Sequence, residues 1–391
     1  MGNRILIVGG GIGGLAAALA CSRNGAALQV FESASEFGEV GAGIQLGPNV
    51  VRILDAWGLH QALAAVAAFP DRLQVRSAVS GRELGVLQLG AAVEQRYGAC
   101  YATIHRADLH ALLLAGLGTR NGVQLAVDSE VVAFEQNESG VNVRCADGRQ
   151  SHADLLVGAD GLWSRVRQAL LNDGAPAATG HLAYRALVPQ SSLPEKLRSH
   201  CITAWLGPQL HVVQYPVRAG EWLNVVAIVH GPMAGNIEDW DHRADVVNLR
   251  SSMLQTCGAL HDLVYAIDEW RLWALNIRPP MRGPNECARG RVALLGDAAH
   301  PMLPYLAQGA GMAIEDAQAL GQVLAGSLAV PDALRAYANA RWQRNARVQA
   351  RAIRNGRIFH ATGPIRWGRD AAMKVLGERL LDVAWLYRGP S

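Results

Sequence analysis

The sequence lacks several features that would place the chain outside the ordinary globular proteins. Its six cysteines are scattered and form no CxxC pair, which argues against a zinc site or a disulfide scaffold and fits a reducing compartment. Charged residues make up 18% of the chain and the formal net charge is +3, a balance that indicates neither a nucleic-acid partner nor an anionic membrane surface. No uninterrupted apolar run reaches the roughly 18–20 residues of a membrane span. We therefore expect a cytoplasmic globular protein with no integral membrane segment.

One N-terminal segment imitates an export signal. Residues 5–20 are uncharged, follow Arg4 and lead to Cys21, as the apolar part of a signal peptide does. The segment is rich in glycine, which is unfavourable in a signal helix, and a single basic residue precedes it. We interpret the segment as part of the fold.

The same segment predicts a strand, a glycine turn, a helix and a second strand. Residues 4–8 form a short apolar run, as buried parallel strands do. Residues 15–24 are rich in alanine and predict a helix that ends near Gly25, and residues 29–32 close a second strand. A unit of about 30 residues in this order is typical of a βαβ motif.

The turn contains the pattern GxGxxG as Gly9, Gly11 and Gly14. In dinucleotide-binding folds the first glycine allows a tight turn, the second the close approach of a pyrophosphate, and the third the packing of helix on strand. Glu32 stands at the next strand end, where an acidic side chain suits the ribose hydroxyls. The motif predicts a bound dinucleotide and leaves NAD and FAD both open.

Two further short apolar runs, at 154–158 and 291–295, lead to the aspartates Asp160 and Asp297. In the second, the run stops abruptly at Gly296, and a carboxylate follows at the tip of what reads as a buried strand. A carboxylate in that place costs free energy unless something hydrogen-bonds to it. Asp297 therefore needs a partner.

Segments of a different character separate these pieces. Residues 71–97 and 177–281 contain short stretches that alternate apolar and polar residues, which is typical of antiparallel strands. A helix is expected from about 309 to 325, and the tail is helical as well. Arginines recur in the tail at a spacing that places them on one helix face, which we interpret as a solvated basic face in preference to a docking site for an anionic partner; they are Arg344, Arg347, Arg351 and Arg354.

Three motifs, in order along the chain, resemble those of the single-component FAD-dependent aromatic hydroxylases, the family of salicylate and hydroxybenzoate hydroxylases. They are the N-terminal GxGxxG, the pattern DGxxSxxR from Asp160 to Arg167, and GDAAHxxxP from Gly296 to Pro304. The resemblance implies an α/β fold of the p-hydroxybenzoate hydroxylase type, with a Rossmann-like FAD-binding domain, an interleaved β-sheet substrate domain and C-terminal helices. On this basis the FAD-binding domain comprises residues 1–70, 98–176 and 282–330, the substrate domain 71–97 and 177–281, and the C-terminal helical region 331–391.

The resemblance also implies the cofactor contacts. In this family the aspartate of the GD motif hydrogen-bonds a ribityl hydroxyl of FAD, which gives Asp297 its expected partner. The helix from about Gly309 is expected to direct its N–H groups at the flavin, where they stabilise negative charge on the reduced ring. Arg106 resembles a family arginine that bridges phosphate or ribityl oxygens. The expected cofactor-binding residues are Gly9, Gly11, Ile12, Gly13, Gly14, Glu32, Gly43, Arg106, Val131, Asp160, Asp297, Gly309, Ala310, Gly311 and Met312.

The reductant implied by the resemblance is NADH or NADPH, since Asp160 and Arg167 resemble a family motif that serves both FAD and the nicotinamide. No second GxGxxG is present for that nucleotide, which fits a family whose reductant has no Rossmann domain of its own. The chain departs from the family at Ala307, where glycine is frequent, and at Ala313, where asparagine is frequent. The loop beside the isoalloxazine is therefore expected to differ in detail.

A candidate substrate surface lies in residues 210–215. Strand periodicity places His211 and Tyr215 on one face, in a pattern that resembles the 3-hydroxybenzoate hydroxylases. Because a phenol becomes more nucleophilic when it loses its proton, we expect His211 to act as the catalytic base or proton relay and Tyr215 to orient the ring or its carboxylate. The alternative is a His and a Tyr satisfied within an ordinary sheet.

Three more residues are expected to bind substrate: Gln45, Arg185 and Pro304. Gln45 lies where similar enzymes run a loop past the flavin ring, and Pro304 matches a family proline whose carbonyl lies near the substrate. For Arg185 three roles stay open, namely a substrate carboxylate, the nicotinamide and a structural ion pair.

The activity implied is that of a monooxygenase that uses FAD, NAD(P)H and O2 to hydroxylate a small hydroxylated aromatic acid, salicylate-like or 3-hydroxybenzoate-like, through a flavin C4a-hydroperoxide. The alternatives are a hydroxylase of an N-heteroaromatic acid, a non-oxygenating FAD-dependent oxidoreductase, and a flavin-binding interaction protein without activity. We expect no metal site, and a homodimer is one oligomeric state to test.

Overall fold

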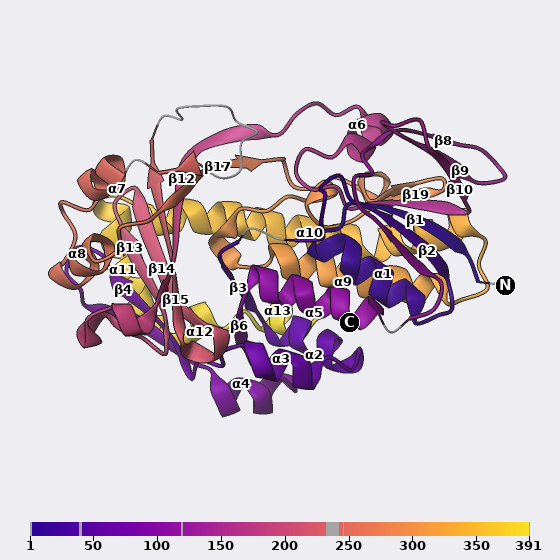
Figure 1. Ribbon diagram of the computed structural model, residues 1–391. Coiled ribbons are helices and arrows are strands. Elements are labelled where there is room, and N and C mark those ends of the chain that lie inside the picture. The colour runs from indigo at the N-terminus through magenta and orange to yellow at the C-terminus, as the bar shows by residue number, and fades with distance from the viewer. Residues whose placement is uncertain (1, 39–40, 119, 232–241, 245, 391) are drawn as a thin grey trace.

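Two sheets form the opposite ends of the molecule, and the long helix α10 (Val330–Phe359) runs between them (Figure 1). The computed structural model describes residues 2–38, 41–118, 120–231, 242–244 and 246–390. The N-terminus lies at the end that carries β1, far from the strands of the second sheet (Figure 1). This arrangement brings segments that are distant in sequence together along α10.

The first sheet is the predicted nucleotide-binding sheet. Its core strand β1 (Arg4–Val8) pairs in parallel with β2 (Ala27–Phe31) and with β11 (Leu155–Gly158), and β11 pairs in parallel with β19 (Val292–Leu294). The order is β18-β19-β11-β1-β2-β7, with β7 (Val123–Ala126) and β18 (Ala288–Arg289) at the edges. Three distant strands therefore place their carboxyl ends at one edge, and the predicted βαβ unit is confirmed.

Helix α1 (Ile12–Ser22) connects β1 to β2 and packs against α5 (Arg106–Gly118) and α9 (Gly309–Leu324). Its alanine side chains are buried almost without exception. Small side chains let the three helices approach closely, which is why an alanine-rich sequence suits this central position.

The second sheet has eight strands in the order β16-β17-β12-β15-β14-β13-β4-β5. All neighbours are antiparallel except β13 and β4, which are parallel. The strands are β4 (Arg72–Ser77), β5 (Glu83–Gln88), β12 (Ala177–Pro189), β13 (Ile202–Gly207), β14 (Leu210–Val217), β15 (Trp222–His230), β16 (His242–Arg243) and β17 (Arg271–Ile277). Every one of them falls within 71–97 or 177–281, the ranges predicted for the substrate domain, whose limits stay a prediction.

The two faces of this sheet differ in what covers them. One face buries Tyr184, Val212 and Val225 with the outer helices α7 (Val246–Ser252) and α8 (Gly258–Tyr265) (Figure 1). The other face buries Ala183 and Ile228 against residues of α10 and of the segment after β19. The second face is therefore directed towards the first sheet, and we call it the inner face.

Smaller elements complete the α/β fold. The strands β3 (Gly43–Leu46) and β6 (Ala102–His105) form an antiparallel pair, and β8 (Val131–Gln136), β9 (Val141–Cys145) and β10 (Gln150–Ala153) form a small sheet. The remaining helices are α2 (Pro48–Ala56), α3 (His60–Val66), α4 (Gly90–Tyr97), α6 (Arg165–Leu171), α11 (Gly363–Leu376), α12 (Glu378–Leu381) and α13 (Ala384–Tyr387). The predicted combination of a Rossmann-like part, an interleaved sheet and C-terminal helices is confirmed.

The expected solvated basic face on the C-terminal helix is wrong for Arg344. Its side chain is 12% exposed, and its Nε and Nη2 bind the carboxylate of Glu315 at 2.6 and 2.7 Å. The reason is tertiary, because α9 packs on α10 and places this acid opposite the arginine.

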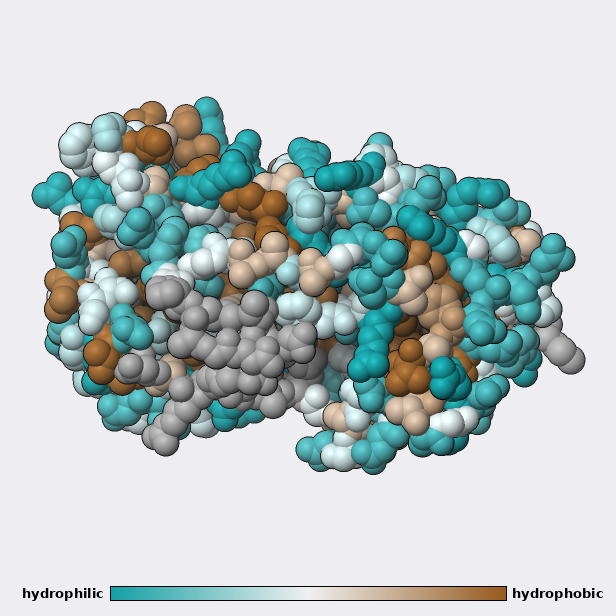
Figure 2. Space-filling model, turned by 90° about the horizontal axis from the view of Figure 1, so that it is seen from above, coloured by the Kyte–Doolittle hydropathy of each residue, from teal (hydrophilic) through white to brown (hydrophobic). Residues whose placement is uncertain are grey.

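The described part of the chain holds no helix that is both long and apolar enough to cross a membrane. On the face seen in Figure 2, hydrophobic residues form separate patches among hydrophilic ones.

Candidate active site

The glycine turn after β1 has the close contacts that a dinucleotide site requires. Gly9 has φ +105°, and a Cβ on it would lie 2.3 Å from the carbonyl oxygen of Ala159. A Cβ on Gly14 would lie 1.8 Å from the carbonyl oxygen of Gly9. Helix α1 then begins at Ile12 with Gly11 as N-cap, so that its first N–H groups face the end of β1, where an anion is favoured.

Glu32 lies against this turn. Its Oε2 accepts a hydrogen bond from the backbone N–H of Gly10 at 2.7 Å, and its Oε1 accepts one from Ala34 at 2.9 Å. The backbone N–H of Ser129 bonds the carbonyl of Glu32, which brings the segment before Val131 to the same edge. The carboxylate is thus held where a ribose contact was predicted, and the contact itself stays a prediction.

The DG motif links the segment after β11 to the segment after β19. Asp160 accepts hydrogen bonds from Ser164 Oγ at 2.6 Å and from the N–H of Val166 at 3.1 Å, and burial raises the pKa of its carboxyl. The buried Arg167 donates to the carbonyl of Ala298 at 3.2 Å and binds Asp173. The bond to Ala298 therefore holds the DG motif next to the GD motif. The roles of Asp160 and Arg167 towards FAD and nicotinamide stay predictions.

The GD motif forms a short 3-10 turn, Gly296–Ala298, directly after β19. Gly296 has φ +58°, a conformation that favours glycine. Asp297 is half-buried, so the cost of placing its carboxylate there is smaller than the buried strand suggested. Its position at the carboxyl end of the sheet fits the predicted contact with a ribityl hydroxyl.

The loop before α9 shows why glycine is frequent at position 307 in the family. Ala307 adopts φ +52° and ψ +39°, a left-handed conformation in which glycine is unstrained. Alanine pays roughly 1–2 kcal/mol for that conformation. Helix α9 begins at Gly309 as predicted. A Cβ on Gly311 would lie 2.9 Å from Val50 Cγ2, whereas a Cβ on Gly309 would meet no heavy atom within 4 Å.

Gly43 on β3 lies close to Arg106, the first residue of α5, whose backbone N–H donates to the carbonyl of Ala42 at 3.0 Å. Gly43 pairs with His105, the residue before Arg106. Gln45, also on β3, accepts a hydrogen bond from the hydroxyl of Tyr101 at 2.8 Å. The predicted residues of this loop are therefore brought together, opposite the second sheet.

A buried ionic network next to the GD loop was not predicted from the sequence. Asp316 in α9 contacts His300 Nε2, lies 2.7 Å from Arg341 Nε and accepts a hydrogen bond from the backbone N–H of Gly296 at 3.3 Å. Burial raises the pKa of Asp316, but His300 and Arg341 outweigh it and hold the pKa well below its usual range. Adjacent Glu315 binds Arg341 as well, at 3.0 Å. Two consecutive acids in an otherwise apolar helix were the signal that could have indicated this network, since buried charges require partners.

Three residues predicted to act on the substrate lie on the inner face of the second sheet. Arg185 on β12 lies opposite Val226 on β15, which lies opposite Val213 on β14. Directly opposed residues point to the same face, so Arg185, His211 and Tyr215 share it. The predicted common face is therefore present, and Arg185 belongs to it.

Tyr215 connects this face to the flavin-side loop. Its hydroxyl donates to the carbonyl of Gly43 at 2.6 Å, and Asn224 accepts from the N–H of Gly43 at 2.6 Å. A Cβ on Gly43 would lie 2.6 Å from the ring of Tyr215, so glycine is required for the contact. Burial raises the pKa of Tyr215, which keeps its hydroxyl a neutral donor.

Arg185 has no carboxylate partner among the residues that the structure describes. Its guanidinium stacks on the ring of Trp273, a contact that carries no negative charge. Burial lowers the pKa of Arg185 well below its usual value, and nearby Arg106 lowers it further. Of the three roles left open, a structural ion pair is absent from the described part of the chain.

His211 lies at the other end of β14, roughly 13 Å from Tyr215 at about 3.3 Å per residue. Its Nδ1 is 2.7 Å from Nε2 of His360, the residue that follows α10, and its ring packs against Tyr305. Burial lowers the pKa of His211 to about 3, and His181 contributes. Pro304 opens the 3-10 turn Pro304–Leu306 and is exposed, while the next residue, Tyr305, packs on the inner face with Ala183 and Ile228.

These residues fit FAD at the edge where the three strands end. The glycine turn packs tightly against neighbouring backbone, Glu32 and Asp297 stand where sugar hydroxyls were expected, and the N-termini of α1 and α9 favour negative charge.

Comparison with known proteins gives the same result. A family model described as "FAD binding domain" matches residues 3–352. The chain is 38% identical over 387 residues to a 3-hydroxybenzoate 6-hydroxylase of Polaromonas naphthalenivorans (strain CJ2), with 98% of this chain and 95% of that protein covered. It superposes on Klebsiella pneumoniae HpxO complexed with FAD and uric acid with a TM-score of 0.84 at 27% identity, over 97% of this chain and 94% of that one. A salicylate hydroxylase substrate complex gives a TM-score of 0.83 at 27% identity, over 99% and 95%. The chain therefore belongs to the FAD-binding-domain family and, within it, to the FAD-dependent aromatic hydroxylases.

Proposed function

We propose that this monooxygenase hydroxylates the ring of a small hydroxylated aromatic acid, 3-hydroxybenzoate-like or salicylate-like, with Arg185 binding the substrate carboxylate. The observation that carries the proposal is the guanidinium of Arg185, which has no acid partner among the described residues and shares one sheet face with Tyr215 and His211. A buried guanidinium is stabilised by an anion, and its planar set of N–H donors matches the two oxygens of a carboxylate.

The reaction consumes one molecule each of NAD(P)H, O2 and aromatic acid, with a proton. One oxygen atom enters the ring and the other leaves as water, while the nicotinamide is oxidised. When bound, FAD supplies the activation of oxygen. The chain's own residues position the ring, exclude water and handle the phenolic proton.

Tyr215 is proposed to orient the substrate. Its hydroxyl is fixed by the carbonyl of Gly43, on the loop that is expected to pass the flavin. A ring held between Arg185 and Tyr215 would face that loop. The bond therefore links the substrate face to the cofactor side.

His211 is proposed to relay the phenolic proton. Its Nδ1 is engaged with His360, and its Nε2 has no hydrogen-bond partner among the described residues. A proton that arrives at Nε2 can be compensated by one that leaves from Nδ1 towards His360. The relative placement of the two imidazoles supports relay in preference to storage of the proton.

The experiment is a substrate panel with the purified, FAD-loaded protein. It compares 3-hydroxybenzoate, salicylate and a hydroxypyridine carboxylate with benzoate, which lacks the hydroxyl, and phenol, which lacks the carboxylate. NADH and NADPH oxidation, O2 uptake and incorporation of 18O into product are measured together. We expect 18O-labelled product from a hydroxylated acid and little from benzoate or phenol.

Two results would change the conclusion. Nicotinamide oxidation without an O2-derived oxygen in any product would favour the non-oxygenating oxidoreductase. Labelled product from the hydroxypyridine carboxylate alone would favour the N-heteroaromatic hydroxylase.

A further inference from the structure

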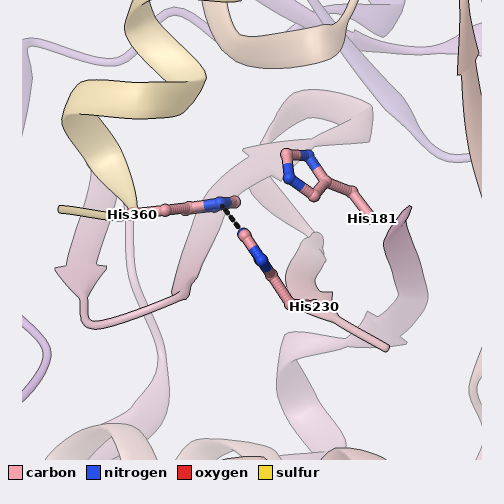
Figure 3. Close-up of side chains that lie close together, drawn as sticks. All are labelled: His181, His230 and His360. Atoms are coloured by element: carbon pink, nitrogen blue, oxygen red, sulfur yellow. Dashed lines mark hydrogen bonds between the residues drawn. The ribbon is translucent and has the colours of Figure 1, made fainter. Parts of the chain in front are cut away.

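Three histidines from distant parts of the chain lie close together where β15 of the second sheet ends (Figure 3). His181 lies on β12 and His230 is the last residue of β15, directly opposite it in the sheet register. His360 follows α10. One ring nitrogen of each lies within 4.8 Å of those of the other two.

The ring nitrogens on the far side of two of these histidines are already bound. Nδ1 of His181 contacts the hydroxyl of Tyr305, and Nε2 of His360 is 2.7 Å from Nδ1 of His211. Nδ1 of His360 faces Nε2 of His230 at 2.8 Å. Histidines that bind metals usually hold their second nitrogen in such a hydrogen bond, which fixes the ring and its tautomer.

The three imidazoles are in the form that binds metals. None of them forms an ion pair with an acid in the described ranges. Burial lowers the pKa of His181 to about 4 and that of His360 to about 2, with neighbouring histidines adding to both effects. Burial lowers the pKa of His230 as well. At neutral pH the rings are therefore uncharged, and their lone pairs are available.

We propose that His181, His230 and His360 form a binding site for a divalent transition-metal ion of the zinc, nickel or cobalt class. The ligand atoms are Nε2 of His181, Nε2 of His230 and Nδ1 of His360, of which the last two already lie 2.8 Å apart. An ion bound there places the proton of the His360–His211 bond on Nε2 of His360, so the proposed relay through His211 operates in the chain without the ion. Imidazole ligands select such ions over magnesium and calcium, which prefer oxygen. No motif indicated the site in advance, since its ligands are separated by 49 and 130 positions along the chain.

The geometry leaves the metal accessible. His230 is exposed and His360 is buried, so one side of the site opens to solvent and the other is held by the fold. Zinc–nitrogen bonds of about 2.0–2.1 Å in a tetrahedron require the ligand nitrogens to lie roughly 3.3 Å apart. The observed nitrogens lie within 4.8 Å of one another, and those of His230 and His360 are 2.8 Å apart. A water molecule would complete the coordination.

The experiment measures metal binding by the FAD-loaded, full-length protein after treatment with a chelator. Zn²⁺ is titrated by calorimetry, and bound zinc after dialysis is counted by mass spectrometry. The test variant is His230→Gln, because this exposed position at a strand end can change without disturbing the core. The matched control is His60→Gln, since the side chain of His60 is 70% exposed and lies in another part of the chain. The flavin absorbance spectrum reports that each protein is folded.

We expect one zinc ion per wild-type and per His60→Gln chain, and an affinity lower by about 100-fold or more in His230→Gln, since loss of even an outer partner of a ligand costs about 10–100-fold. Excess Mg²⁺ should not compete. Absence of stoichiometric binding by the wild type, or equal affinity in His230→Gln, would overturn the proposal.

Discussion

Replacement of Arg185 by methionine should weaken substrate binding and leave the fold at least as stable as before. The guanidinium stacks on Trp273 and has no acid partner in the parts of the chain that the structure describes. Met retains much of the apolar stem that packs on the ring and removes the charge. The variant therefore separates the role in binding from a role in folding.

The expected magnitude follows from the charge. Hydrogen bonds to a charged group contribute about 1.5–3 kcal/mol, and each 1.4 kcal/mol changes an equilibrium constant about tenfold. The Kd of the aromatic acid should rise by roughly 10- to 150-fold. Burial lowers the pKa of Arg185, which means that the folded protein disfavours the cation. Removal of that cation should leave Tm unchanged or raise it.

The assay is a titration of the flavin absorbance change with substrate, together with thermal unfolding. Neutral 3-hydroxybenzamide serves as the reference ligand, and Arg82→Met, at an exposed turn position, serves as the matched variant. The preference for acid over amide should disappear only in Arg185→Met. A lower Tm with an unchanged Kd would refute the reasoning, because it would make Arg185 a structural residue.

Three other changes probe the site. Asp316→Asn should lower the free energy of unfolding by about 3–5 kcal/mol in urea titrations, because it removes one of the two acids that bind the buried Arg341 and the carboxylate that contacts His300; a loss under about 1 kcal/mol would contradict the network. Since the pKa of Asp316 is held low, its contribution to stability is present above about pH 4 and is lost as the pH falls below that value. The free energy of unfolding of the variant should therefore decrease less steeply in acid than that of the wild type. Gly14→Ala should abolish FAD retention on a desalting column, because its Cβ would lie 1.8 Å from the carbonyl oxygen of Gly9, and a yellow protein with normal flavin content would disprove the close packing. Tyr215→Phe should cost about 1 kcal/mol of stability through loss of the hydrogen bond to Gly43 and lower the fraction of NAD(P)H that yields product; an unchanged product yield would remove Tyr215 from substrate orientation.

The nucleotide-binding part could be predicted because its requirements are local. Gly9 must adopt φ +105° and Gly14 must lie against the preceding turn, and only glycine meets both conditions next to a buried strand. The apolar runs that lead to Asp160 and Asp297 indicated two strand ends for the same reason, since a short buried parallel strand reads as a continuous hydrophobic run. Period-two alternation likewise placed His211 and Tyr215 on one face.

The partners of these residues could not be predicted, because contacts over long sequence separations depend on how sheets and helices pack. His211 meets His360 from 149 positions away, and Arg341 meets Asp316 across 25. The sequence predicted a solvated Arg344, but α9 places Glu315 against its guanidinium. Local periodicity specifies which way a side chain points, and only the tertiary structure decides which charge, ring or hydroxyl it finds there.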